Sequence, residues 1–123
     1  MKKTAFTLLA LMAFVFTGIN SFAQNAKTIN LEQTEGEFTI QELTLEAGDY
    51  IFEIANSGVD HEVGFVLAPK GMTEADHHIK EAYVQQTVKD GTTSTSKVVS
   101  LEKGEYVYFC PMNPTPQYTL TVK

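Results

Sequence analysis

Residues 106–114 read YVYFCPMNP and contain Cys110, the only cysteine of this 123-residue chain. Aromatic residues alternate along the first part of this run, which is typical of a β-strand, and the proline after the cysteine ends the pattern. Met112 places a second sulfur two residues after the thiol. Side chains two apart in extended backbone project to the same side. The run therefore predicts a strand that enters a loop with two soft metal donors.

The first 23 residues are typical of a secretory signal peptide. Lys2 and Lys3 supply a positive start, residues 6–16 form a short apolar core, and residues 21–23 place small residues at the cleavage positions. Residues 24–123 would then form one domain with a single hydrophobic core. No later apolar run is long enough to span a bilayer. We therefore expect a periplasmic or secreted protein that does not insert into a membrane.

The domain after the signal peptide is acidic. It carries seven lysines, no arginine and fifteen acidic residues, which gives a formal charge of −8. Such a surface argues against nucleic acid as a partner. It is compatible with docking to a basic protein, although solubility alone would also explain it. A lone cysteine cannot form an internal disulfide, and we expect a monomer whose core holds it together unaided or with the help of a metal.

Short alternating segments separated by turns predict an all-β, Greek-key sandwich. Between residues 73 and 88 the apolar spacing changes to three and four, which predicts one inserted amphipathic helix over about residues 73–89. Thr73 could cap its start and Gly91 could stop it. The strands are expected at residues 28–31, 38–40, 43–45, 50–54, 61–67, 98–101, 105–110 and 118–122.

His61 is the first candidate partner for Cys110. Imidazole, thiolate and the thioether of Met112 together form a donor set that suits copper. In the alternative, Cys110 packs as a small buried hydrophobe, Met112 fills a gap and His61 lies at a strand edge. A trio of Cys110, His61 and Asn113 could be imagined as a thiol protease, but the local signatures of those enzymes are absent, so no enzyme is predicted.

Two stretches resemble the ligand regions of cupredoxins, the family of plastocyanin and azurin. Residues 45–56 with 61–65 resemble the first ligand region, and residues 101–111 resemble the hairpin into the ligand cysteine. Residues 118–122 resemble the last strand of the family. The resemblance implies a cupredoxin-like β-sandwich that binds copper, shuttles single electrons to a redox partner protein, and uses His61 and Cys110 as two metal ligands.

The loop after Cys110 departs from the family pattern. In the short, amicyanin-like loop, a histidine follows three residues after the cysteine and a methionine three residues after that. Those positions hold Asn113 and Pro116, although the loop length is kept. Asparagine offers an amide oxygen, which is a hard and weak copper ligand, and proline offers none. Asn113 is therefore a candidate metal ligand because of its position, which is that of the missing second histidine, and not because of its donor strength.

Three hypotheses follow from this loop. In the first, Met112 replaces a lost ligand and joins His61 and Cys110 in a Cu(I) site that handles or delivers copper to a trafficking partner. In the second, His77 or His78 is recruited, and only one could reach the site because helical neighbours point in different directions. In the third, the fold serves as a metal-free interaction module, since a fold alone does not fix a function.

Overall fold

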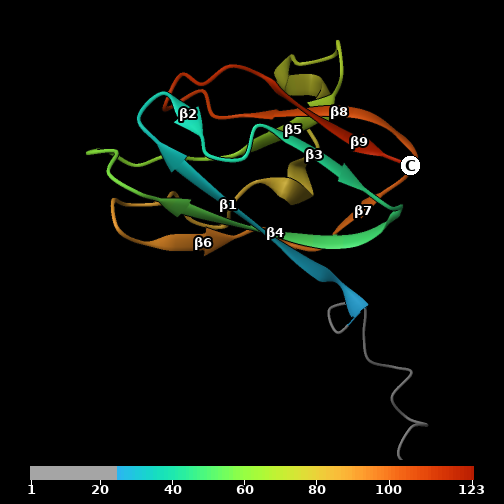
Figure 1. Cartoon of the computed structure of the whole chain (residues 1–123), viewed down its shortest axis with the longest axis horizontal. Coiled ribbons are helices and arrows are strands. Elements are labelled where there is room, and N and C mark those ends of the chain that lie inside the picture. Colours follow the sequence, from blue (N-terminus) through green and yellow to red (C-terminus); the bar gives the residue numbers. More distant parts are fainter. Residues whose placement is uncertain (1–24) are drawn as a thin grey trace, which may run out of the picture.

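The computed structural model describes residues 25–123, which form two β-sheets packed face to face (Figure 1). The predicted signal peptide, residues 1–23, lies outside the described residues. Among the residues described, no helix is long and apolar enough to cross a bilayer. The elements in chain order are β1 (Lys27–Thr34), β2 (Glu37–Phe38), β3 (Glu42–Leu45), β4 (Gly48–Asn56), β5 (Val66–Pro69), η2 (Ala75–His77), η3 (Lys80–Ala82), β6 (Thr93–Thr95), β7 (Val99–Leu101), β8 (Gly104–Phe109) and β9 (Tyr118–Val122).

Both sheets mix parallel and antiparallel pairs. The first sheet has the order β2-β1-β4-β6, and β7 pairs with the other end of β4. In it β1 and β4 run parallel, with Leu31 opposite Ile54. The second sheet has the order β3-β9-β8-β5, in which β3 and β9 are parallel and β8 pairs antiparallel with both β9 and β5. The all-β sandwich expected from the sequence is confirmed.

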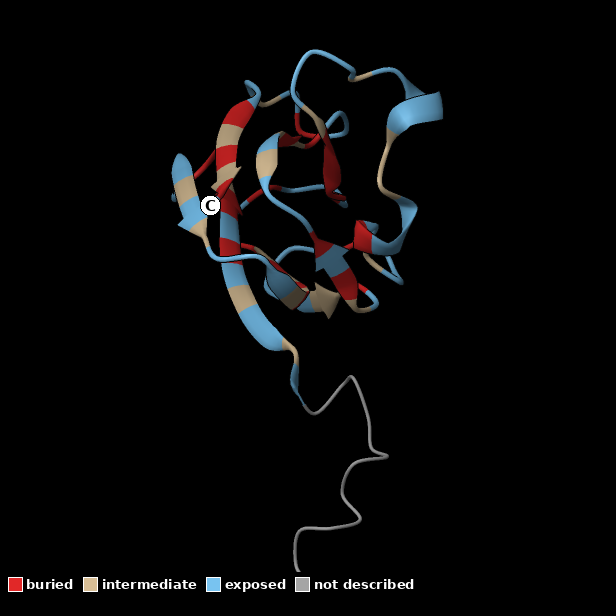
Figure 2. Cartoon of the chain, turned by 90° about the vertical axis from the view of Figure 1, so that its right-hand side faces the viewer, coloured by how far each residue is buried: buried red, intermediate tan, exposed pale blue. Residues whose placement is uncertain are grey.

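The core lies between the sheets and follows the two-residue period of the strands. Along β4, buried and less buried residues alternate from Tyr50 to Asn56, and Figure 2 shows this alternation as bands of colour along the strands. Phe38 packs edge-on against Tyr108 and Tyr118, with ring centroids 5.2 and 5.8 Å apart. Phe65 joins this cluster at 6.1 Å from Phe38. Aromatic rings therefore fill the end of the sandwich from which the Cys110 loop emerges.

The helix predicted over about residues 73–89 is wrong. This segment contains only two single 3₁₀ turns, η2 and η3. Outside these two turns, backbone donors that a helix would use internally bond to other segments instead. Ile79 N–H donates to the carbonyl of Leu67 at 2.8 Å, and Val88 exchanges two backbone hydrogen bonds with Val63, at 2.9 and 3.0 Å. Backbone hydrogen bonds to distant segments thus formed in place of the helix that the apolar spacing of three and four residues predicted.

The strand predicted over residues 61–67 is shorter and later than expected. The strand β5 begins only at Val66, and Val63 forms an isolated bridge with Val88. Residues 61–65 therefore cross the end of the sandwich as an irregular segment. This position brings the segment into contact with the loop that follows Cys110.

Candidate metal centre and the Cys110 loop

Cys110 follows directly after β8, and its side chain is fully buried in the apolar core. Two hydrogen bonds close the loop behind it. Cys110 N–H donates to the Thr115 hydroxyl at 3.0 Å, and Thr115 N–H donates to the Cys110 carbonyl at 3.2 Å. Gly64 N–H donates to Cys110 Sγ at 3.3 Å. The predicted strand-to-loop transition at Cys110 is therefore present, with the sulfur turned toward the backbone of residues 61–65.

His61 lies at the surface, three residues before the amide that faces the sulfur. Its Nδ1 lies 3.0 Å from the carbonyl oxygen of Glu62, so this nitrogen donates to the backbone. Val63, between His61 and Gly64, is fully buried in the same core cluster as Cys110. The segment therefore presents a valine to the core and leaves the imidazole exposed.

Met112 is the second sulfur of the loop and is 46% exposed. A Cβ built on Gly64 would lie 3.3 Å from Met112 Sδ. Because Gly64 N–H also faces Cys110 Sγ, both sulfurs lie against the same glycine. The absence of a side chain at position 64 leaves room for the thioether. Residues 111–114 form a turn and not the extended backbone assumed from the spacing, so Cys110 is buried and Met112 exposed although both lie beside Gly64.

Asn113 is 2% exposed, and its amide group makes three hydrogen bonds. Its Oδ1 accepts from Gly36 N–H at 2.8 Å, and its Nδ2 donates to the carbonyl of Thr34 at 2.9 Å and to Gln33 Oε1 at 3.0 Å. All three partners belong to β1 or to the turn that joins β1 to β2. The side chain at the position of the missing second histidine therefore points into the β1–β2 hairpin.

His77 and His78 do not share a helix. His77 is exposed in η2, and His78 follows it in extended backbone. His78 Nδ1 lies 2.8 Å from the Tyr83 hydroxyl, and its Nε2 lies 3.0 Å from the carbonyl of Thr73. A carbonyl only accepts, so Nε2 carries the proton and Nδ1 accepts from Tyr83 in the neutral ring. A metal would have to displace one of these partners.

The donor set does not fit a type 1 copper centre, which requires two imidazoles and a thiolate. Across residues 25–123, no three histidine, cysteine, aspartate or glutamate side chains converge on one point. Cys110 and Met112 each lie beside Gly64, His61 is exposed, and the amide of Asn113 is engaged elsewhere. The assignment of these four residues as metal ligands stays a prediction.

An apolar groove of about 270 Å³ opens beside the Cys110 loop. Tyr83 and Met112 are exposed at its edge. The hydroxyl of Thr87, which also lines it, donates to the carboxylate of Glu62, so a negative charge lies at the rim. The groove can accept an apolar side chain from a partner. Its lining residues are Gly64, Phe65, Val66, Tyr83, Val84, Thr87, Pro111 and Met112.

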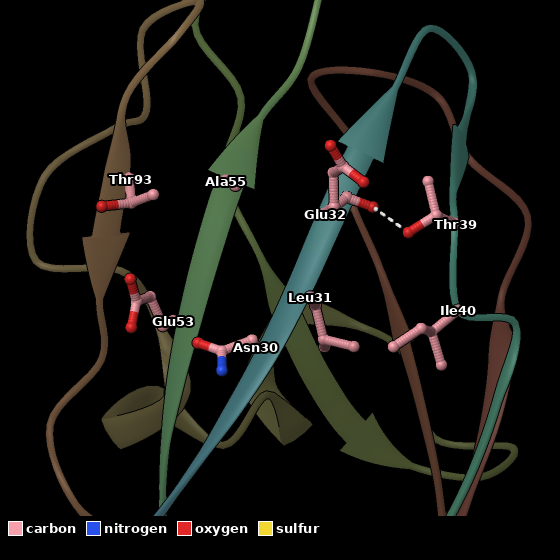
Figure 3. Close-up of a pocket in the computed structure, with 8 residues that line it drawn as sticks. All are labelled: Asn30, Leu31, Glu32, Thr39, Ile40, Glu53, Ala55 and Thr93. Carbon is pink, nitrogen blue, oxygen red and sulfur yellow. Dashed lines mark hydrogen bonds between the residues drawn. The ribbon is translucent and has the colours of Figure 1, made fainter.

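A second hollow, of about 280 Å³, lies on the outer side of β1, β4 and β6 and contains no residue of the Cys110 loop (Figure 3). The segment at Thr39 and Ile40 closes one side of it, and Glu32 and Glu53 supply its charges. It has no sulfur or imidazole, so it offers no soft metal donor. The two-residue alternation of the strands does not predict this hollow, because the hollow depends on where the segment after β2 lies beside β1.

Tyr108 lies beneath the loop and has a purely structural hydrogen bond. Its hydroxyl donates to the carbonyl of Ile40 at 2.6 Å. Burial, with smaller contributions from Tyr118 and Glu42, raises the pKa of Tyr108 to about 12. The phenol therefore remains protonated at neutral pH and serves as a donor that joins β8 to the segment before β3.

Sequence reasoning missed Gln33 and Gly64. Gln33 is fully buried in β1 and donates its Nε2 proton to the carbonyl of Gly64 at 2.7 Å. The available signal was its place in the strand, since Gln33 stands two residues after the buried Leu31 and so faces the core. A buried polar side chain at such a position needs hydrogen-bond partners.

Comparison with known proteins agrees with this architecture. Residues 5–122 match the Cupredoxin-like domain family, and the chain therefore belongs to the cupredoxin-like proteins. No protein in the curated collection of sequences matches it.

Solved structures of blue copper proteins share the fold. Auracyanin A, a blue copper protein from Chloroflexus aurantiacus, is 18% identical with a TM-score of 0.64, over 78% of this chain and 98% of its own. Auracyanin from Roseiflexus castenholzii is 14% identical with a TM-score of 0.62, over 80% and 98%. An azurin from Methylomonas sp. strain J is 15% identical with a TM-score of 0.57, over 79% and 98%. At this identity the likeness establishes the fold, and the site must be argued from this chain's own residues.

Proposed function

We propose that this chain is an exported cupredoxin-like binding module that docks a protein partner at its Cys110 end and has no type 1 copper centre. The observation that carries the proposal is Asn113. The position expected to hold the second imidazole carries a buried amide whose oxygen and nitrogen are both engaged with the β1–β2 hairpin. The Asn113 side chain could not coordinate a metal without breaking these hydrogen bonds.

The surface beside this loop supports docking. The groove next to Met112 is mainly apolar, and large apolar groups are exposed at its edge in Met112 and Tyr83. Glu62 adds negative charge at the rim, and the domain as a whole is acidic. A partner that inserts an apolar side chain and surrounds it with lysine or arginine would match this surface.

A second candidate function is Cu(I) handling. It is favoured by the contact of both sulfurs with Gly64, because soft sulfur donors suit Cu(I). Cys110 as thiolate and Met112 as thioether would be the ligands, and His61 could join them only by turning away from the Glu62 carbonyl. When bound, the ion would be cargo to be delivered, and this chain's residues would hold and release it.

Copper loading separates these functions. The protein is purified after export, its metal content is measured, and Cu(II) is added while visible absorption is recorded. Cu(I) is then offered in competition with a chromophoric chelator to wild type and to Cys110→Ser. The binding module predicts no thiolate-to-copper absorption and no retained copper. Tight 1:1 Cu(I) binding that is lost in Cys110→Ser would establish the second candidate, and a strong visible band would refute both.

Docking is tested by photo-crosslinking in the exporting cell. A photoreactive residue replaces Met112 at the groove or, as a matched control, the exposed Gln117. The proposal predicts a discrete crosslinked product from position 112 that is reduced by Glu62→Lys, because the substitution reverses the charge at the rim. Equal products from positions 112 and 117, or none from position 112, would overturn docking at this groove.

A further inference from the structure

We propose that Gln33 and Asn113 form an amide lock that holds the Cys110 loop closed without a metal and keeps the thiol inaccessible. In this view Asn113 is required as an amide and is not merely the remnant of a ligand position. The lock goes beyond the proposed binding function, because it concerns what fixes the loop and not what the loop contacts.

The lock joins three segments that are far apart in the sequence. Asn113 bonds to Gly36, Thr34 and Gln33, which precede it by 77, 79 and 80 residues. Gln33 then donates to the carbonyl of Gly64, 31 residues further on. The two side chains therefore connect the Cys110 loop, the β1–β2 hairpin and the segment of residues 61–65.

The bonding partners allow only one orientation of each amide. The carbonyl of Gly64 can only accept, so Gln33 presents its nitrogen there and its oxygen to Asn113. Asn113 must then donate to Gln33, and it also donates to the carbonyl of Thr34. Gly36 N–H can only donate, so it meets the Asn113 oxygen. The four bonds are therefore compatible with one arrangement of the two amides.

These requirements are those of a primary amide, and neither a carboxylate nor an imidazole meets them. Position 113 needs two N–H donors and one acceptor, whereas a carboxylate donates nothing and a neutral imidazole has one donor. Both amides are buried, with 0% of Gln33 and 2% of Asn113 exposed, so a group left unpaired would not be hydrated. An unsatisfied buried polar group is more costly than a hydrogen bond is favourable. A histidine at position 113 would therefore restore a ligand type and disrupt the lock.

The lock ends at the residue that covers the thiol. Gly64 accepts from Gln33 through its carbonyl and donates its N–H to Cys110 Sγ at 3.3 Å. A continuous path of hydrogen bonds thus runs from Gly36 through both amides to the sulfur. If the path is cut at Asn113, the loop loses its attachment to the hairpin, and Cys110 should become accessible before the sandwich unfolds.

Thiol labelling tests this directly. The exported protein is treated with a chromophoric disulfide reagent, and the labelling rate of Cys110 is measured for wild type, Asn113→Ala and Val99→Ala. Val99 is buried in β7, which pairs with β4, and makes no hydrogen bond to the lock residues through its side chain, so it serves as a control for general loss of stability. Denaturant is adjusted so that the variants are compared at equal free energy of unfolding.

At equal global stability, Asn113→Ala should label at least about tenfold faster than Val99→Ala, because three hydrogen bonds to the loop are lost. Exchange of the Gly36 amide proton, whose acceptor is Asn113 Oδ1, should accelerate in the same variant. Equal labelling of the two variants at matched stability would overturn the lock.

Two further measurements keep the test decisive if Asn113→Ala does not fold. Gln33→Glu keeps an acceptor toward Asn113 but loses the donor to Gly64, so it should also speed labelling. Wild type is labelled with and without strong chelators of Cu(I) and divalent metals. The lock predicts the same rate in both cases. Faster labelling after chelation would show that a metal holds the loop and would refute the proposal.

Discussion

The Tyr108→Phe variant should be less stable than wild type at neutral pH and more stable than wild type at high pH. The Tyr108 hydroxyl is buried and donates to the carbonyl of Ile40 at 2.6 Å. A hydrogen bond of this kind is worth about 1 kcal/mol net. Near pH 7 the Tyr108→Phe variant should therefore be about 1 kcal/mol less stable than wild type.

High pH reverses this difference. Burial, then Tyr118 and Glu42, raises the pKa of Tyr108 from 10.0 to about 12. The unfolded chain releases this proton near pH 10, whereas the folded protein retains it until about pH 12. The stabilising contribution is therefore complete below pH 10 and is lost as the pH rises to 12, by at most about 3 kcal/mol. Phenylalanine has no proton to lose, so the two stability curves should cross.

The assay is urea unfolding followed by circular dichroism at several pH values from about 7 to about 11.5, a range that reaches into the interval between the two pKa values. Tyr106→Phe is the control, because the Tyr106 hydroxyl donates to the carbonyl of Glu102 near the surface. This variant removes a tyrosine hydroxyl outside the core and so controls for the loss of a phenol as such. A constant difference between wild type and Tyr108→Phe over the whole range would refute the argument that burial raises this pKa.

Two further predictions concern the sulfur side of the loop. Gly64→Val should cost about 1–3 kcal/mol in thermal unfolding experiments, because a Cβ already comes within 3.3 Å of Met112 Sδ and the added methyl groups overpack the site. A valine variant as stable as wild type would refute overpacking and would mean that the half-exposed Met112 thioether moves aside. Met112→Leu should change stability by less than about 1 kcal/mol, since Met112 is half-exposed and leucine has a similar volume. In the Cu(I) candidate the same variant should lose affinity in the chelator competition, and unchanged affinity would exclude the thioether as a ligand.

The strands that carry the core could be predicted because their pattern is local. In β4 and β9, each residue's burial follows its place in a two-residue alternation, and the sequence displays that alternation directly. The segment of residues 73–89 could not be predicted this way. Its apolar residues recur at near-helical spacing, but Ile79 and Val88 use their backbone hydrogen bonds with Leu67 and Val63. The spacing of apolar residues does not tell whether the backbone groups bond within a helix or to distant segments.

The same limit applies to the site. Cys110 and Met112 could be identified from the sequence because they stand two residues apart in one loop. The role of Asn113 could not, since its partners lie about 80 residues earlier and include a glutamine inside an otherwise apolar strand face. Side chains that can bind a metal are recognised from their residue type alone. The hydrogen-bond partners of Asn113 depend on how β1 and the loop meet in space.

The amide lock also bears on how the length of the loop after Cys110 is interpreted. A loop that keeps the spacing of a copper loop suggests at first that it was kept for copper. Asn113, however, must reach the carbonyl of Thr34 and the amide of Gly36 while Cys110 remains joined to Thr115 within the same turn. One residue more or fewer between Cys110 and Asn113 would shift the amide relative to those backbone groups, since consecutive Cα atoms are about 3.8 Å apart. The contacts of Asn113 with the hairpin therefore give this loop length a reason that needs no metal, and the length alone is not evidence for a bound metal.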